Sequence, residues 1–441
     1  MTKKIVLRTI CLLLFFLLLI PFGVVETNAS SYSDALPNMT QAKCVYFANL
    51  DKKITLVKKS ETEAIAPAST AKLMTGLIAI EYFKEAPNTL VTVTDAMTSN
   101  IYGAKMNLSA GDVLSVTDLI YATICGGFND AAHVLACAVA GTSDDFVILM
   151  NKRARELGAI ETNYKNPTGW DTDEMSTTLN DTVVIAKEAL KSDAYMEISS
   201  TPTYKIIFQN SEKEFTVKNR NALISTYYAQ GYTNKYARGM IAGMTDNGGY
   251  CVVTQAIIDN HNYLCIVMGA SETNGEINSF KIVNSLIDYA RKNLGYIQIM
   301  KSGTTICKAP IEHALLETHN DSSDVSVKVG EDIELFLPYT VNVNTEITQK
   351  HYLYEKTLRA PISAGTQVGY VDFYYNGELI ESAPLVIDTD IKSNKFELFI
   401  ESAKSFLLSR ASMLSIVFFI TIFYTYHTFK KRIKYKSKFR N

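Results

Sequence analysis

The sequence predicts an α+β fold that is followed by a smaller all-β region and an apolar C-terminal helix. Strand-like runs occur near residue 44 and return near residue 237, and helical periodicity fills the interval between them. Residues 300–392 are rich in strand patterns and carry little helical periodicity. We therefore expect one α+β domain at 30–296, with strands from both of its ends in one sheet, and a small β-sandwich at 297–392.

In the first domain the pattern changes from strand to helix and back to strand. Short strands are expected at 44–50 (CVYFANL) and 53–59 (KITLVKK), and helix is expected after Pro67. Apolar residues at three-and-four spacing predict helical segments at 116–141, 144–158 and 277–293. Two strands, 249–259 and 262–270, are expected to form a hairpin whose turn is Asn260-His261-Asn262.

The second region has the sequence features of a β domain. The segments IELFLPYTVNV, QVGYVDFYYNG and ELIESAPLVI each favour a strand. Asn376-Gly377 stands between two of these apolar runs, which is a strong signal for a two-residue hairpin.

Residues 1–29 have the features of a secretory signal peptide. A basic start precedes the apolar run ICLLLFFLLLI, and Thr27-Asn28-Ala29 offers a small-residue cleavage site. The alternative is an uncleaved membrane anchor. The polar segment ETNASSYSD that follows at once favours cleavage.

Residues 411–429 are predicted to form a transmembrane helix. The run contains no charged residue over 19 positions, which is about enough to cross a ~30 Å hydrocarbon core. Interfacial aromatic residues and the basic tail at 430–441 indicate that this end is cytoplasmic. The alternative, a buried helix, gives no reason for a basic run to begin where the apolar run stops. We expect a single-pass membrane protein whose residues 30–410 lie outside the cytoplasm, with 393–410 as a juxtamembrane stalk.

The charge is divided unevenly along the chain. The 441 residues have a net charge of −2, whereas residues 30–410 hold 33 basic and 44 acidic residues, a net of −11. A nucleic-acid partner is therefore not expected, because phosphate contacts need clustered Lys and Arg on the folded domain.

The cysteines and histidines do not predict a metal or cofactor. Seven Cys include Cys11 in the signal segment, and the other six have no metal-like spacing. The six His form no HExxH motif. Disulfides are possible outside the cytoplasm, but a domain of this size does not need them.

The segment APASTAKLMTG carries the first chemical motif, Ser69-Thr70-Ala71-Lys72. A Ser and a Lys three residues apart on a helix share a face. The hydroxyl lies near the positive end of the helix dipole, and the amine is within reach to accept its proton. A Ser-x-x-Lys pair alone is a weak signal, because it occurs by chance and commonly marks a helix N-cap.

The flanking residues resemble a known family. APASTAKLMT resembles the nucleophile segment of the low-molecular-mass penicillin-binding proteins, the serine-type D-Ala-D-Ala carboxypeptidases (peptidase S11). The resemblance continues in the family's order through four further segments, namely 103–136, 146–170, 238–253 and 360–387. It implies a β-lactamase/transpeptidase-like domain followed by a β domain. It also implies an acyl-enzyme on Ser69, with Lys72 as base and Asn129 holding the substrate amide.

Three positions depart from the family's motifs. The second motif, Ser-x-Asn in the family, is Gly127-Phe128-Asn129 here, so the hydroxyl that passes protons is missing. The third motif, Lys-Thr-Gly, is Ile241-Ala242-Gly243, so the cation and hydroxyl for the substrate carboxylate are missing.

Without a cationic neighbour Lys72 is expected to stay protonated. The substitute cations considered are Arg220, Lys235 and Arg238, although Arg238 would face away from Ile241 on a regular strand. The family's turn often has His where this chain has Thr168.

Two functions follow from the resemblance. The first is a membrane-anchored carboxypeptidase acting on peptidoglycan stem peptides, and open to β-lactams, with activity lowered by Gly127, Ile241 and Ala242. The second is a degenerate relative that binds wall peptides or a partner protein without turnover. A β-lactamase shares the nucleophile but does not predict the β domain or the membrane anchor.

Overall fold

The computed structural model describes residues 27–28, 36–315, 324–408 and 410–438. The predicted signal peptide lies outside these ranges except for Thr27 and Asn28, and Cys11 lies outside them too. The chain divides into two compact units, residues 1–295 with 338–340, and residues 296–337 with 341–441. Each unit is described by itself.

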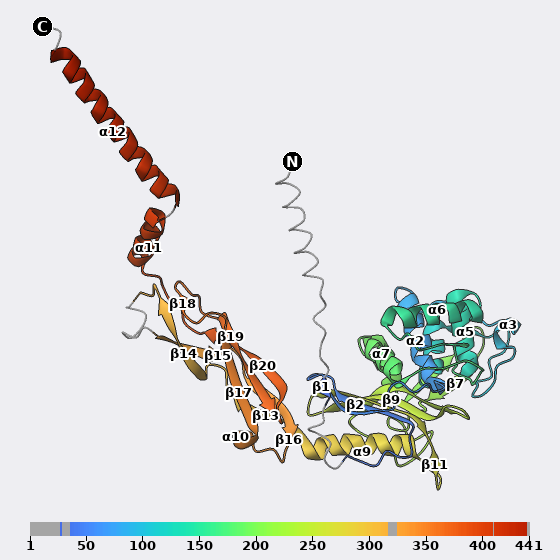
Figure 1. Ribbon diagram of the computed structural model, residues 1–441. Coiled ribbons are helices and arrows are strands. Elements are labelled where there is room, and N and C mark those ends of the chain that lie inside the picture. Colours follow the sequence, from blue (N-terminus) through green and yellow to red (C-terminus); the bar gives the residue numbers. More distant parts are fainter. Residues whose placement is uncertain (1–26, 29–35, 316–323, 409, 439–441) are drawn as a thin grey trace. The chain divides into compact units, whose positions relative to one another are not determined.

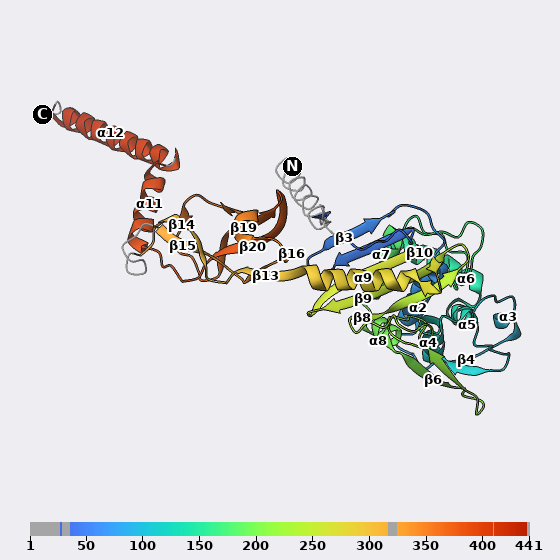
Figure 2. The ribbon, with the colours of Figure 1, turned by 90° about the horizontal axis from the view of Figure 1, so that it is seen from below.

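The first unit is built on a six-stranded sheet (Figures 1 and 2). Its strands, in spatial order, are β1 (Thr27–Asn28), β3 (Ile54–Lys59), β2 (Cys44–Asn49), β10 (His261–Ala270), β9 (Gly249–Ile258) and β8 (Ala237–Thr245). Strand β2 pairs antiparallel with β10, so Phe47 lies opposite Cys265. Strands from the two ends of the unit thus share one sheet, as predicted.

Helices cover both faces of this sheet. The amphipathic helix α9 (Asn278–Asn293) lies along one face, and most other helices of the unit lie on the opposite face (Figure 1). They are α2 (Ala71–Tyr82), which follows the short 3₁₀ helix η2 (Ala68–Thr70), α3 (Asp95–Thr98), α4 (Val116–Ile124), α5 (Asn129–Ala140), α6 (Ser143–Leu157), α7 (Leu179–Ala189) and α8 (Asp193–Ser200). Three small hairpins complete the unit, β4 (Leu90–Thr92) with β5 (Val113–Ser115), β6 (Thr203–Ile207) with β7 (Glu214–Lys218), and β11 (Glu272–Thr273) with β12 (Glu276–Ile277).

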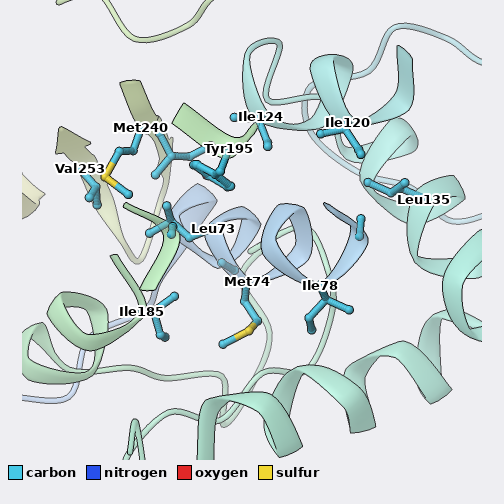
Figure 3. Close-up of a cluster of buried hydrophobic side chains, with 14 of the residues drawn as sticks. Leu73, Met74, Ile78, Ile120, Ile124, Leu135, Ile185, Tyr195, Met240 and Val253 are labelled. Atoms are coloured by element: carbon cyan, nitrogen blue, oxygen red, sulfur yellow. The ribbon is translucent and has the colours of Figure 1, made fainter. Parts of the chain in front are cut away.

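Helix α2 lies at the centre of the core of this unit. Leu73, Met74 and Ile78 are buried on it and contact apolar side chains from the surrounding elements (Figure 3). These neighbours are Ile120 and Ile124 of α4, Leu135 of α5, Ile185 of α7, Tyr195 of α8, Met240 of β8 and Val253 of β9. Residues 71–79 of α2 are all buried, which holds the start of this helix and the Ser-x-x-Lys motif against the sheet and the other helices.

Two local expectations need correction. The segment 116–141 is not one continuous helix, because it breaks at Cys125–Phe128, where Gly127 has φ +65°. The turn between β9 and β10 is Asp259-Asn260, with φ of +50° and +65°, and not Asn260-His261-Asn262. Asp and Asn both tolerate positive φ, so composition alone does not distinguish the two placements.

The second unit has a β domain with its own core. Its six-stranded sheet has the order β17 (Ile347–Leu353), β19 (Thr366–Tyr375), β20 (Glu378–Ile387), β15 (Asp324–Val329), β14 (Thr305–Glu312) and β18 (Leu358–Arg359). A two-stranded ladder of β13 (Leu294–Met300) and β16 (Ile333–Pro338) adds Ile333, Leu335 and Leu337 to the core that contains Phe373. The Asn376-Gly377 turn joins β19 to β20 with φ of +50° and +82°, which confirms the predicted hairpin.

Three helices remain in the second unit. They are the short α10 (Val343–Glu346), then α11 (Lys395–Leu408) and α12 (Arg410–Lys438). Within the described ranges no single helix is long and apolar enough to cross a membrane, and only the bent pair of α5 and α6 meets the length and composition that a span requires.

The cysteines of the described ranges are all free thiols, namely Cys44, Cys125, Cys137, Cys251, Cys265 and Cys307.

Candidate active site

Ser69 lies in the 3₁₀ turn η2 that leads into α2. Its neighbours Ala68 and Thr70 are buried, whereas Ser69 itself is half-buried. The turn is closed by the backbone N–H of Thr70, which donates to the carbonyl of Pro67 at 3.1 Å. Ala68 has φ +48°, a left-handed conformation that non-glycine residues seldom adopt. The surrounding structure therefore holds the Ser69 hydroxyl in a defined position at the start of a buried helix.

Lys72 is fully buried and contacts Ser69. Its Nζ lies 3.3 Å from Ser69 Oγ and donates to the carbonyl oxygen of Thr168 at 2.5 Å. Burial and, as a smaller contribution, the positive charge of Arg220 together lower the pKa of Lys72 from 10.5 to about 7. A large fraction of the amine is therefore neutral near pH 7, as a general base for Ser69 requires.

The turn Asn166-Pro167-Thr168-Gly169 supplies the carbonyl that holds Lys72. Asn166 Oδ1 accepts hydrogen bonds from the backbone N–H groups of Thr168, Gly169 and Trp170, and from the Thr168 hydroxyl. The turn also accepts a hydrogen bond from Thr75 of α2 at the Pro167 carbonyl, at 2.7 Å. Thr168 thus contacts Lys72 through its backbone, a role that does not depend on its side chain and that sequence reasoning did not find.

Gly169 allows this turn to pack against the nucleophile segment. Its φ is +77°, and a Cβ at this position would lie 1.7 Å from the carbonyl oxygen of Ala68, the residue before Ser69. Only a glycine fits there, for both conformational and steric reasons.

Asn129 is the first residue of α5 and is buried. Its Nδ2 donates to the carbonyl of Tyr102, and its backbone N–H donates to the carbonyl of Ala104, both at 2.7 Å. Gly103 lies between Asn129 and Trp170, because a Cβ on it would be 2.7 Å from Asn129 Nδ2 and 2.9 Å from Trp170 Cζ3. Among the described residues nothing donates to Asn129 Oδ1, which leaves that oxygen able to accept a substrate N–H.

Strand β8 packs directly on Ser69. A Cβ on Gly243 would lie 2.3 Å from Ser69 Cβ and 2.4 Å from Ser69 Oγ, so Gly243 permits the close approach. Ile241 and Ala242, which precede it on β8, are buried and carry no polar group. The structure therefore brings Ser69, Lys72 and β8 together, and the two β8 residues that precede Gly243 provide no cation there.

Of the three substitute cations, only Arg220 acts on Lys72. A Cβ on Gly127 would lie 2.9 Å from Arg220 Cδ, so this side chain passes the position where the family's second-motif Ser is expected. Arg238 instead donates to the carbonyls of Lys235 and Ala237. Lys235 and Arg238 line a separate cavity of about 710 Å³ that contains neither Ser69 nor Lys72. The expectation that Lys72 lacks a cationic neighbour was therefore wrong.

A cavity of about 550 Å³ adjoins the turn at 166–169. Tyr102, Thr168 and Trp170 line it, and the Tyr102 and Trp170 rings stack with their centroids 6.1 Å apart. No group of His, Cys, Asp and Glu side chains in the described part of the chain is arranged to hold a metal ion.

A serine hydroxyl beside a buried lysine, at the base of a helix packed on an α+β sheet, defines a protein of the Ser-x-x-Lys active-serine class. Residues 35–272 match the D-alanyl-D-alanine carboxypeptidase family, peptidase S11, and residues 316–393 match the C-terminal domain of penicillin-binding protein 5. The chain belongs to the D-alanyl-D-alanine carboxypeptidase family, whose members act on peptidoglycan. The predicted transpeptidase-like domain and the β domain after it are confirmed.

Relatives of this family align with most of the chain. D-alanyl-D-alanine carboxypeptidase DacF of Bacillus subtilis is 27% identical over 371 residues, which cover 82% of this chain and 88% of the relative. DacC of Escherichia coli is 28% identical, covering 77% of this chain and 82% of the relative. The crystal structure of DacD from Francisella tularensis shares the fold with a TM-score of 0.59 at 22% identity, covering 81% of this chain and 95% of that one.

Proposed function

We propose that this protein is a D-Ala-D-Ala carboxypeptidase that forms an acyl-enzyme on Ser69 and turns over slowly. Ser69 Oγ attacks the carbonyl of the penultimate D-Ala, and the neutral amine of Lys72 accepts the hydroxyl proton. The terminal D-Ala leaves with a proton, and water then hydrolyses the acyl-enzyme. The observation that carries this proposal is the buried Lys72 Nζ, 3.3 Å from Ser69 Oγ, with a pKa of about 7.

Slow turnover is expected because this chain lacks polar side chains at three positions where the family has them. Gly127 has no hydroxyl to pass a proton to the leaving amine, and a positioned acid or base contributes about 10²–10⁴ in rate. Ile241 and Ala242 cannot hold the substrate carboxylate as the Lys and Thr of the family would. Attack by Ser69 still has its base, Lys72, whereas the proton transfers of the later steps lack the hydroxyl at position 127 that would carry the proton. We therefore expect acylation to be less impaired than complete turnover.

The alternative function is binding of wall peptides without turnover. The same absences, at Gly127, Ile241 and Ala242, favour it. It differs from the carboxypeptidase in one measurable way, because it needs no covalent bond at Ser69.

Labelling with a fluorescent penicillin is expected to mark the full-length protein, since attack on a β-lactam carbonyl needs only the Ser69–Lys72 pair. The measurement is in-gel fluorescence after denaturation, which reports covalent attachment only. Ser69→Ala is the control and should show no label. A protein that binds a D-Ala-D-Ala peptide yet takes no label would favour the alternative function.

We also propose that α12 anchors the protein in the cell membrane, with its basic end in the cytoplasm and the catalytic domain outside. The support is the exposed apolar surface from Leu414 to Phe429, which ends at Lys430, Lys431 and Arg432. Deleting residues 409–441 is expected to move the protein from the membrane pellet to the soluble fraction, measured by immunoblotting after ultracentrifugation. A truncated protein that stays in the pellet would instead support the uncleaved N-terminal anchor.

A further inference from the structure

The backbone of Arg220, beside the active site, is held by hydrogen bonds from the buried side chains of its two neighbours, Asn219 and Asn221. Asn219 is 3% exposed, and its Nδ2 donates to the carbonyls of Ser199 and Thr201. Asn221 is 2% exposed, and its Nδ2 donates to the carbonyl of Gly239 on β8 at 2.6 Å. Two buried amides thus tie the Arg220 backbone to the end of α8 and to the strand that packs on Ser69.

Arg220 also contacts the segment Cys125–Phe128, which separates α4 from α5. The Arg220 backbone N–H donates to the carbonyl of Cys125 at 2.9 Å. The side chain then passes Gly127, whose added Cβ would lie 2.9 Å from Arg220 Cδ and 3.9 Å from Nε. A side chain at 127 would require Arg220 Cδ to shift, and φ +65° disfavours one as well. Gly127 therefore permits the present path of Arg220.

The guanidinium of Arg220 has no carboxylate partner among the described residues. It lies 4.9 Å from the centroid of the Tyr228 ring, a cation–π contact that leaves its planar donors unpaired with acid. The side chain is half-buried, and its charge acts on the fully buried Lys72. An unpaired guanidinium that is close to a catalytic amine is suited to a planar anion on the substrate, which it can bind through two hydrogen bonds.

We propose that Arg220 holds the free C-terminal carboxylate of the substrate, in place of the cation that position 241 does not supply. This inference rests on the proposed function, because it assigns a residue to the substrate of that same site. Arg220 enters from the side of Gly127, whereas the family's lysine would come from β8. Gly127, which has no side chain, leaves room for the Arg220 side chain at this position.

The test compares ligands that differ only in the carboxylate. Full-length protein in detergent is acylated with benzylpenicillin or with its methyl ester, and the ratio of the two second-order rate constants is measured. Arg220→Met keeps the apolar stem beside Gly127 and removes the charge. It is expected to lower the acid-to-ester ratio by about 10- to 100-fold, the loss of charge-assisted hydrogen bonds. Any effect of Arg220 on Lys72 is common to both ligands, so the ratio isolates the carboxylate contact.

Two further variants support the comparison. Arg238→Met, in the separate cavity, is expected to leave the ratio unchanged. Arg220→Lys retains a charge with a single point of attachment and is expected to restore part of the ratio, which shows that the fold of the variants is intact. If Arg220→Met slows the acid and the ester by the same factor, Arg220 acts only through Lys72 and the proposal is wrong.

A second measurement separates this proposal from the function on which it rests. In a Ser69→Ala background, calorimetry compares a stem-peptide mimic ending in D-Ala-D-Ala with the same peptide amidated at its C-terminus. A preference for the free carboxylate that disappears with Arg220→Met supports the role of Arg220 even if the wild-type protein is never acylated. A preference that survives this substitution, or no preference at all, overturns it.

Discussion

Replacing Lys72 with alanine is expected to slow the acylation of Ser69 by a β-lactam about 10²–10⁴-fold, the contribution of a positioned general base. Lys72 Nζ lies 3.3 Å from Ser69 Oγ, within reach of the hydroxyl proton. The measurement is the rate of label incorporation from a fluorescent penicillin. Lys152→Ala, on the exposed surface of α6, is the matched control and should react like the wild type. A wild-type rate in the Lys72 variant would show that another group accepts the proton.

The rate of acylation should rise with pH through about 7. Burial, together with the charge of Arg220, lowers the pKa of Lys72 to about 7, and only the neutral amine accepts a proton. The wild-type rate constant is therefore expected to fall tenfold per pH unit well below 7 and to level off above it. A rate constant that continued to rise up to about pH 10.5 would mean that the pKa of Lys72 is not lowered in the folded protein.

The same shift has a consequence for stability. The unfolded chain keeps the Lys72 proton up to about pH 10.5, whereas the folded protein releases it near pH 7. The unfolded state binds more protons between these values, so Lys72 makes the free energy of unfolding increase with pH from about 7 to 10.5. Lys72→Ala should remove this contribution, which urea unfolding at pH 7 and pH 9 can measure.

Replacing Gly169 with alanine is expected to destabilise the first domain by more than about 3 kcal/mol and to abolish labelling of Ser69. The new Cβ would lie 1.7 Å from the Ala68 carbonyl oxygen, in a residue with φ +77°. The turn must move, and with it the Thr168 carbonyl that holds Lys72. Urea unfolding and penicillin labelling measure the two effects.

Gly158→Ala is the matched control for this substitution. Gly158 also has a left-handed φ, +91°, but a Cβ there meets no atom within 4 Å. This variant should lose only about 1 kcal/mol of unfolding free energy, from backbone strain at the positive φ, and should keep full labelling. Equal destabilisation by the two substitutions would show that the contact between Gly169 and Ala68 is not essential.

Local sequence patterns predicted most elements of the fold. The strands 44–50 and 53–59 and the helix 277–293 agree with β2, β3 and α9 to within a residue, because alternating or helical periodicity directly reflects which face is buried. The errors occurred where local chemistry is ambiguous. Asp259, Asn260 and the following residues allow more than one turn placement, and the two glycines at 126–127 divide what the apolar pattern shows as one helical segment.

The sequence by itself determined the α+β class, the Ser69–Lys72 pair and the absence of polar groups at Gly127, Ile241 and Ala242. Only the tertiary structure decided whether Lys72 can act as a base. Its burial, its hydrogen bond to the Thr168 carbonyl 96 residues away, and the charge of Arg220 all come from segments distant in the chain. The pKa of an amine depends on the solvent and charges that surround it in space, and no spacing along the sequence specifies those surroundings.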